Sequence, residues 1–174
     1  MESAPNKLYE IKKLDYFETI NYEFSRNFVE YIKNYNQLDQ NIGITIAWLV
    51  SCNNPRLAYP MIKKLNTHDK MCVLKEVVKN KFNETNQEIV KAYCEWIEKA
   101  STTRTERNQF IHGYWHLSGS VTEKPIFFSP ISWDIEARAD KNQNFSLDEF
   151  RVIVDELKAV CTEFGNLRKR YIIC

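Results

Sequence analysis

The residues whose side chains are best suited to catalysis or binding lie in one short run, RNQFIHGYW, at positions 107–115. The run contains Arg107, Asn108 and His112, and His112 is one of only three histidines in the chain. A neutral imidazole can take or give a proton near cellular pH, and a guanidinium can bind a phosphate through two parallel hydrogen bonds. Together these groups could withdraw a proton from a ribose 2′-hydroxyl, direct its oxygen onto the adjacent phosphate and stabilise the charge, without a metal.

A long helix is expected to carry these residues. Thr85 and Glu88 have the spacing of a capping box, which opens a helix, and Gly113 is a natural residue to follow its last turn. The apolar stripe of this helix consists of Ile89, Val90, Tyr93, Trp96, Ile97 and Ala100. Continued at about 100° per residue, the same face bears Arg104, Arg107, Asn108 and Ile111, with His112 at its edge. Charge on a core-facing stripe is costly unless it is paired or needed, so we expect this helix end to line a cleft or a subunit contact.

Two other interpretations of the segment stay open at the level of sequence. Thr103 and Glu106 form another capping-box pattern, and a new helix starting there would change the phase of the stripe. The cluster could also be a surface network in which Arg104 or Arg107 forms an ion pair with Glu98 or Glu106.

Side chains next to the run offer further candidates. Tyr114 and Trp115 could stack on a base, whereas His116 could either assist in the site or simply point outward from a strand. His68 and Cys72 are four residues apart on an expected helix, but no third metal ligand lies near them in the sequence. We therefore expect no metal site and no cofactor.

Composition places broad limits on the function. The chain has 174 residues with a formal net charge of +1, 44% hydrophobic and 27% charged residues, so a single globular domain over 1–174 is expected. The balanced charge argues against tight nonspecific nucleic-acid binding, so any RNA contact must be local.

The five cysteines are scattered along the sequence, and we expect them to be reduced residues of the core. The start of the chain has no signal-peptide pattern, and the apolar run 42–50 is about half of what a membrane span needs. A cytoplasmic protein with no membrane partner is expected.

The remaining elements are mostly helical. The apolar pattern predicts a helix over 8–36 and a buried helix over 42–52, with a buried strand as the alternative for the second segment. It also predicts a short helix over 55–65, with Pro60 at a kink or boundary. A further helix is expected over 68–81, capped by Thr67. Residues 114–133 are aromatic and β-branched, which favours a small β-hairpin or flap. Ser146 and Glu149 form a capping box that opens a final amphipathic helix. The sum is an all-α bundle of about five or six helices with that small β excursion.

The run Arg107-Asn108-Gln109-Phe110-Ile111-His112 resembles the Rx4-6H signature of HEPN domains, which often carry a polar residue directly after the arginine. The resemblance covers the six motif residues and the general helix order. It implies an all-helical fold with the motif at the end of a core helix. It also implies a metal-independent endoribonuclease whose homodimer forms one composite cleft from two motifs.

By the same resemblance, Arg107 and His112 are catalytic and Asn108 orients them. Arg104, Tyr114 and Trp115 are then the candidates for substrate binding. Members of the family act on RNA in toxin–antitoxin and antiphage defence systems, often beside a nucleotidyltransferase-type antitoxin. Other HEPN-like members are inactive and bind only nucleotide or a protein partner, and that is the alternative function.

Overall fold

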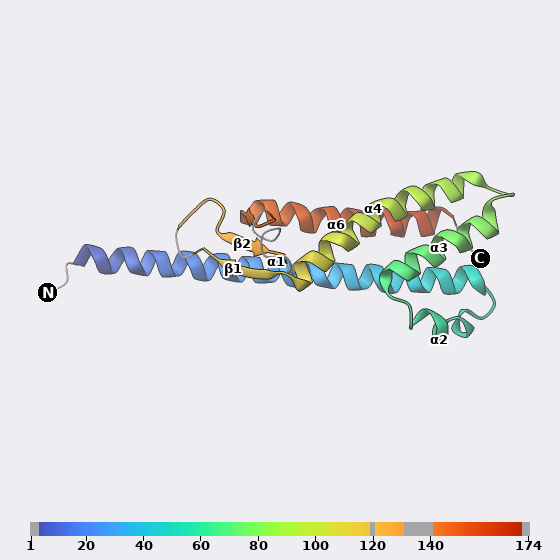
Figure 1. Ribbon diagram of the computed structural model, residues 1–174, viewed down its shortest axis with the longest axis horizontal. Coiled ribbons are helices and arrows are strands. Elements are labelled where there is room, and N and C mark those ends of the chain that lie inside the picture. The colour runs from blue at the N-terminus through green and yellow to red at the C-terminus, as the bar shows by residue number, and fades with distance from the viewer. Residues whose placement is uncertain (1–3, 119–120, 131–140, 172–174) are drawn as a thin grey trace. The chain divides into compact units, whose positions relative to one another are not determined.

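The computed structural model describes the backbone of residues 4–118, 121–130 and 141–171 (Figure 1). Its elements are α1 (Ala4–Val50), the 3-10 helix η1 (Pro55–Leu57), α2 (Tyr59–Ile62), α3 (Thr67–Phe82), α4 (Gln87–His112), β1 (Tyr114–Leu117), β2 (Ile126–Ser129), β3 (Gln143–Phe145) and α6 (Leu147–Arg170). The expected helical protein with a small β excursion is confirmed. No helix among the described residues combines the length and apolar character needed to cross a membrane.

The chain divides into two compact units, which we describe separately. One unit comprises residues 1–31 and 108–155, and the other comprises residues 32–107 and 156–174. We call them the sheet unit and the helical unit. Helices α1, α4 and α6 each contribute residues to both units. The predicted single domain over 1–174 stays a prediction.

The helical unit is built around large side chains of α4 and α6. Trp96 has none of its surface exposed, its ring stacks on Phe164 at a centroid distance of 4.1 Å, and its Nε1 donates to the Val160 carbonyl at 3.0 Å. Helix α3 joins α1 through an ion pair of 2.5 Å between Lys70 Nζ and Asp39 Oδ2. A lysine this deeply buried requires such a carboxylate, because an unpaired buried charge is costly.

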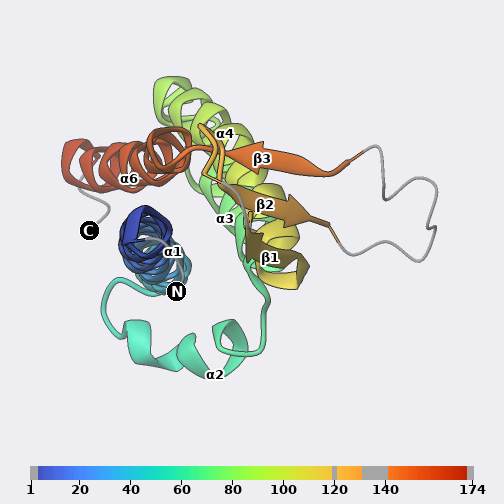
Figure 2. The same cartoon turned by 90° about the vertical axis from the view of Figure 1, so that its left-hand side faces the viewer.

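The sheet unit contains three antiparallel strands in the order β1-β2-β3 (Figure 2). Trp115 of β1 and Phe128 of β2 are cross-strand partners with ring centroids 4.5 Å apart. The Trp115 ring also lies 5.2 Å from Phe24 of α1 and 5.6 Å from Phe150 of α6. One face of the sheet therefore packs into an aromatic core. The expected hairpin is confirmed by the antiparallel pairing of β1 with β2, whereas residues 119–120 and 131–133 of the expected hairpin or flap lie outside the described residues.

Helix boundaries differ from the expectations in four places. The short helix expected over 55–65 is the 3-10 helix η1 followed by the short α-helix α2. The segment 8–36 and residues 42–50 of the second segment belong to one continuous helix, α1, so the strand alternative for the second is wrong. Helix α3 is capped by Asn66, whose Oδ1 accepts from the Asp69 amide, rather than by Thr67. Helix α4 is capped by Asn86, whose Oδ1 accepts from the Ile89 amide at 3.3 Å, rather than by Thr85. In both cases an asparagine next to the expected cap fills the position, Asn66 just before Thr67 and Asn86 just after Thr85, and asparagine is among the best N-caps.

Other local predictions hold. The capping box of α6 is confirmed, because Glu149 Oε2 accepts from the Ser146 amide at 2.8 Å and Ser146 Oγ accepts from the Glu149 amide at 3.1 Å. Pro60 lies in the first turn of α2, where its missing amide proton costs nothing.

The cysteines depart from the expectation of five reduced core residues. Cys72, Cys94 and Cys161 are free, but Cys72 is exposed rather than buried. Cys52 is disulfide-bonded. The prediction is therefore wrong for Cys52 and, as to burial, for Cys72.

Candidate functional site

Helix α4 is unbroken from Gln87 to His112, so the helix that was expected to carry the motif is confirmed. The Thr103 hydroxyl donates to the Lys99 carbonyl one turn earlier, at 3.4 Å, as it does in a helix interior. Thr103 is therefore not a cap, and the alternative of a new helix starting there is wrong.

The buried face of α4 does not follow the extrapolated stripe. Thr103 and Phe110 are buried, with 8% and 5% of their surface exposed, and Arg107 is half-buried. Asn108 and His112 are exposed. The predicted common face for Arg107, Asn108 and His112 is wrong: five residues correspond to about 140° of rotation and about 7.5 Å of rise along a helix.

Arg107 faces the interior of the helical unit. Its guanidinium carbon lies 5.1 Å from the centroid of the Tyr35 ring, a cation–π distance. Burial raises the pKa of the Tyr35 phenol, and a hydrogen bond with Thr67 and the charge of Arg107 counteract part of that rise. Arg104 also acts on Tyr35 electrostatically, so both arginines border the same ring. The predicted substrate-binding residue Arg104 is thus half-buried beside Arg107.

The alternative of a surface ion-pair cluster lacks support. Within the described part of the chain, neither Glu98 nor Glu106 forms an ion pair, so neither neutralises an arginine of the motif. Burial, followed by repulsion from Glu156, raises the pKa of the Glu106 carboxyl. A carboxyl stabilised by a nearby guanidinium would instead show a lowered pKa.

His112 is the last residue of α4 and its side chain is exposed. Its imidazole makes no hydrogen bond or ion pair with any residue that the structure describes. Asn108, one turn earlier, is also exposed. Because residues four apart on a helix are neighbours, these two side chains share the solvent-facing side of the helix end.

Position 113 favours glycine for a steric reason. A Cβ atom at this position would lie 1.9 Å from Phe128 Cε2 and 2.9 Å from the Gln109 carbonyl oxygen. None of the described glycines has a positive φ, so the expected left-handed cap is not what selects glycine here. The close approach of Phe128 therefore explains why a glycine stands between the end of α4 and the start of β1.

The residues after Gly113 alternate between solvent and core. Tyr114, with 58% of its surface exposed, and His116 face outward. Trp115 points the other way, into the aromatic core, and its Nε1 donates to the Phe110 carbonyl at 2.8 Å. Packing of this kind covers the indole ring, so we leave Trp115 out of the proposed site.

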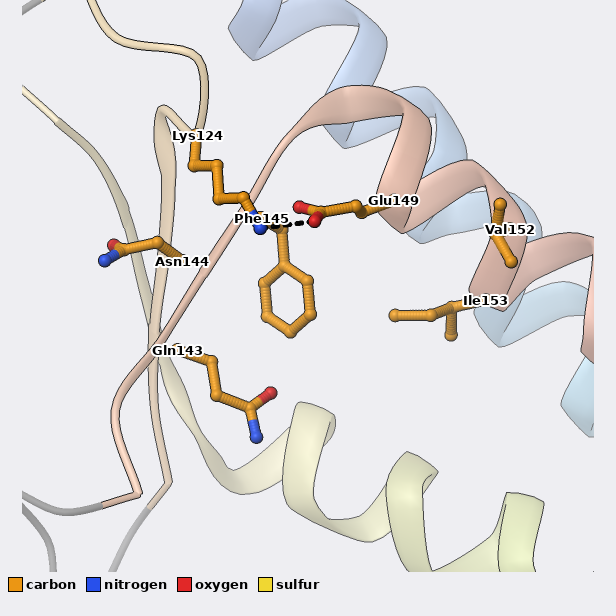
Figure 3. Close-up of a pocket in the computed structure, with 7 residues that line it drawn as sticks. All are labelled: Lys124, Gln143, Asn144, Phe145, Glu149, Val152 and Ile153. Atoms are coloured by element: carbon orange, nitrogen blue, oxygen red, sulfur yellow. Dashed lines mark hydrogen bonds and ion pairs between the residues drawn. The ribbon is translucent and has the colours of Figure 1, made fainter.

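A pocket of about 510 Å³ lies elsewhere in the sheet unit (Figure 3). Its apolar lining comes from Phe145, Val152 and Ile153, and its only charged groups, Lys124 and Glu149, are paired with each other. It contains none of the residues predicted from the sequence and no histidine, cysteine or hydroxyl nucleophile. Chemistry at His112 would therefore not use this pocket.

A metal centre has no basis in the described residues, where no group of three potential ligands occurs. His68 Nε2 and Cys72 Sγ are 3.8 Å apart and form only a pair. No protein-family model matches the chain, and neither the curated proteins nor the solved structures provide a significant match. The resemblance to HEPN domains therefore stands on the motif residues and the helical fold.

Proposed function

We propose that the chain is a metal-independent endoribonuclease of the HEPN type that acts in the cytoplasm as a toxin or defence effector. The observation that carries the proposal is the exposed imidazole of His112 at the end of α4, with the exposed Asn108 one turn before it. An imidazole in water with no partner among the described residues is available to a substrate. Arg107 supplies the guanidinium that the reaction needs.

In the proposed reaction, His112 takes the proton of a ribose 2′-hydroxyl. The 2′-oxygen then forms a bond to the adjacent phosphorus, and the bond from phosphorus to the 5′-oxygen breaks. The 5′-oxygen leaves as a hydroxyl after it receives a proton from a second imidazole or from water. The products are a 2′,3′-cyclic phosphate and a 5′-hydroxyl, and Arg107 stabilises the additional negative charge on the phosphate oxygens.

A second copy of the chain resolves a geometric difficulty in this scheme. On one helix the directions of Arg107 and His112 differ by about 140°, so the two groups do not converge on one phosphate from the same copy without help. In a homodimer, the arginine of one copy meets the histidine of the other. The same arrangement supplies the second imidazole as the general acid. An antitoxin, of the nucleotidyltransferase type that the resemblance implies, would act by covering this exposed end of α4.

The test is cleavage of single-stranded RNA by the purified protein in excess EDTA. We expect cleavage by the wild type and a loss of roughly 100-fold or more for His112→Ala, the usual contribution of a general base. His68→Ala is the matched control, since His68 is an exposed histidine on α3 outside the motif, and it should cleave like the wild type. Equal rates for the wild type and His112→Ala would reject the proposal.

One observation favours the alternative, a non-catalytic module that binds nucleotide or a protein partner. The Arg107 guanidinium packs over the Tyr35 ring, which is a structural use of the arginine. In that case Arg107→Ala lowers the melting temperature, ligand or partner binding survives His112→Ala, and no RNA is turned over.

A further inference from the structure

The register of the sheet places five side chains on one face, and one of them, Ser129 opposite Tyr114, is buried. His116 of β1, Phe127 of β2 and Asn144 of β3 are direct cross-strand partners, and Tyr114 lies two residues before His116 on β1. Directly paired residues of antiparallel strands project to the same side of a sheet, as do residues two apart on one strand. We call these four residues the outer sheet face.

The opposite face is already used by the protein core. Trp115, Phe128 and Gln143 form the neighbouring cross-strand row, and Phe128 is 2% exposed. Figure 3 shows Asn144 pointing away from the side on which the Phe145 ring lies. The outer sheet face therefore contributes little to the core of this unit.

The outer sheet face is aromatic although it meets solvent. The rings of Tyr114 and His116 have centroids 5.6 Å apart, and those of His116 and Phe127 are 4.4 Å apart. Tyr114, His116 and Asn144 are exposed and Phe127 is half-buried. Three neighbouring rings that do not fill a core are suited to bind flat ligands by stacking. Nucleobases are such ligands, because every base has a π-face.

Charge and position narrow the ligand further. None of the four residues carries a carboxylate, so these side chains add no negative charge that would repel a polyanion. Asn144 adds an amide that can donate to or accept from a base edge. Tyr114, at the start of β1, lies two residues after His112, the proposed general base.

We infer that the outer sheet face binds the unpaired bases of single-stranded RNA next to the phosphate at which the RNA is cut, with Tyr114, His116 and Phe127 as stacking rings. The inference rests on the proposed function, which it deepens by naming the substrate class. Bases in a duplex are already stacked on one another and offer no free faces. The substrate is therefore RNA that is unpaired beside the cut.

The experiment measures binding without cleavage. The full chain carrying His112→Ala is titrated into a short single-stranded RNA that contains 2-aminopurine, whose fluorescence is quenched when an aromatic ring stacks on it. The same RNA annealed to its complement is the comparison. We expect quenching with the single strand and at least tenfold weaker binding to the duplex.

Ring variants identify the surface. Phe127→Leu keeps apolar volume but removes the ring, and His116→Ala removes another; each should weaken binding by about 5- to 150-fold, the usual effect of losing one stacked base. His116→Phe keeps a ring and should restore binding. Val152→Ala is the matched control, because Val152 is 56% exposed on α6 in the same unit and outside the outer sheet face. It should bind like the parent.

The outcomes separate this inference from the proposed function. If RNA binding depends on these rings but the wild type cuts no RNA, the inference is retained and the proposed nuclease function is rejected. Cleavage that depends on His112 but is indifferent to the ring variants would retain the nuclease and overturn the inference. Equal binding of single strand and duplex, or no binding at all, would also overturn it and leave the face as a surface for a protein partner.

Discussion

Replacement of Gly113 by alanine tests how the end of α4 is positioned. The new methyl group would lie 1.9 Å from Phe128 Cε2, and ordinary contact begins near 3.4 Å. The ring has to move by about 1.5 Å, or the helix end has to shift away from it. Neither is easy, because Phe128 is 2% exposed and packs between Trp115 at 4.5 Å and Phe110 at 5.4 Å.

Overpacking a well-filled core costs about 1–3 kcal/mol and occasionally more. The overlap here is large and involves a backbone carbonyl as well as the ring, so we place Gly113→Ala at the upper end, about 3 kcal/mol. For a chain of this size, each kcal/mol lowers the melting temperature by about 2–4 °C. The expected decrease is therefore roughly 6–12 °C, measured by circular dichroism at 222 nm.

Gly165→Ala provides the matched control. Gly165 lies inside α6, and nothing lies within 4 Å of a Cβ atom added there. Alanine should stabilise that helix by about 0.5–1 kcal/mol. In a Phe128→Leu background, which makes room for the methyl group, Gly113→Ala should cost measurably less than in the wild type. A Gly113→Ala protein that melts at or above the wild-type temperature would refute the steric explanation.

Other perturbations follow from the same structure. Asp39→Ala leaves the buried Lys70 ammonium without its carboxylate, which should cost about 3 kcal/mol in urea unfolding, and adding Lys70→Met should recover most of it. Burial raises the pKa of Glu106, so the wild type loses stability as the pH rises through that pKa. Glu106→Gln should therefore be more stable than the wild type at pH 7, with a gain that shrinks as the pH falls toward 4.5; a gain that grows on acidification would contradict this. Burial also raises the pKa of Cys161 to about 11. The exposed Cys72 should react first with a thiol reagent, and Cys72→Ser should remove that fast phase.

The sequence predicts the elements of this protein better than the faces that they expose. Apolar spacing is enough to locate α4 and α6, and the change to β-branched and aromatic residues after Gly113 is enough to locate the hairpin. The predicted face of α4 is wrong because its inward-facing positions, the buried 96, 100, 103 and 110 and the half-buried 107, alternate steps of four and three residues. That spacing has a period of 3.5 rather than 3.6, as in helices packed side by side.

The same effect explains the missed continuity of α1. Its buried positions 31, 35, 38, 42 and 46 maintain nearly the same spacing. Between them, the mostly polar stretch 36–41 contains no glycine or proline that would interrupt a helix. A search for heptad spacing would have found both features. The contact between Gly113 and Phe128 could not have been found in this way, because it depends on how β2 pairs with β1 far along the chain.

The nature of the RNA ends tests the central claim most directly. Wild-type protein is incubated in EDTA with a defined single-stranded RNA and with the same RNA carrying 2′-O-methyl groups, and the fragments are weighed by mass spectrometry. Attack by a ribose oxygen that His112 deprotonates predicts fragments with 2′,3′-cyclic phosphate and 5′-hydroxyl ends, and an uncut methylated strand. Fragments with 3′-hydroxyl and 5′-phosphate ends, or cleavage of the methylated strand, would contradict it.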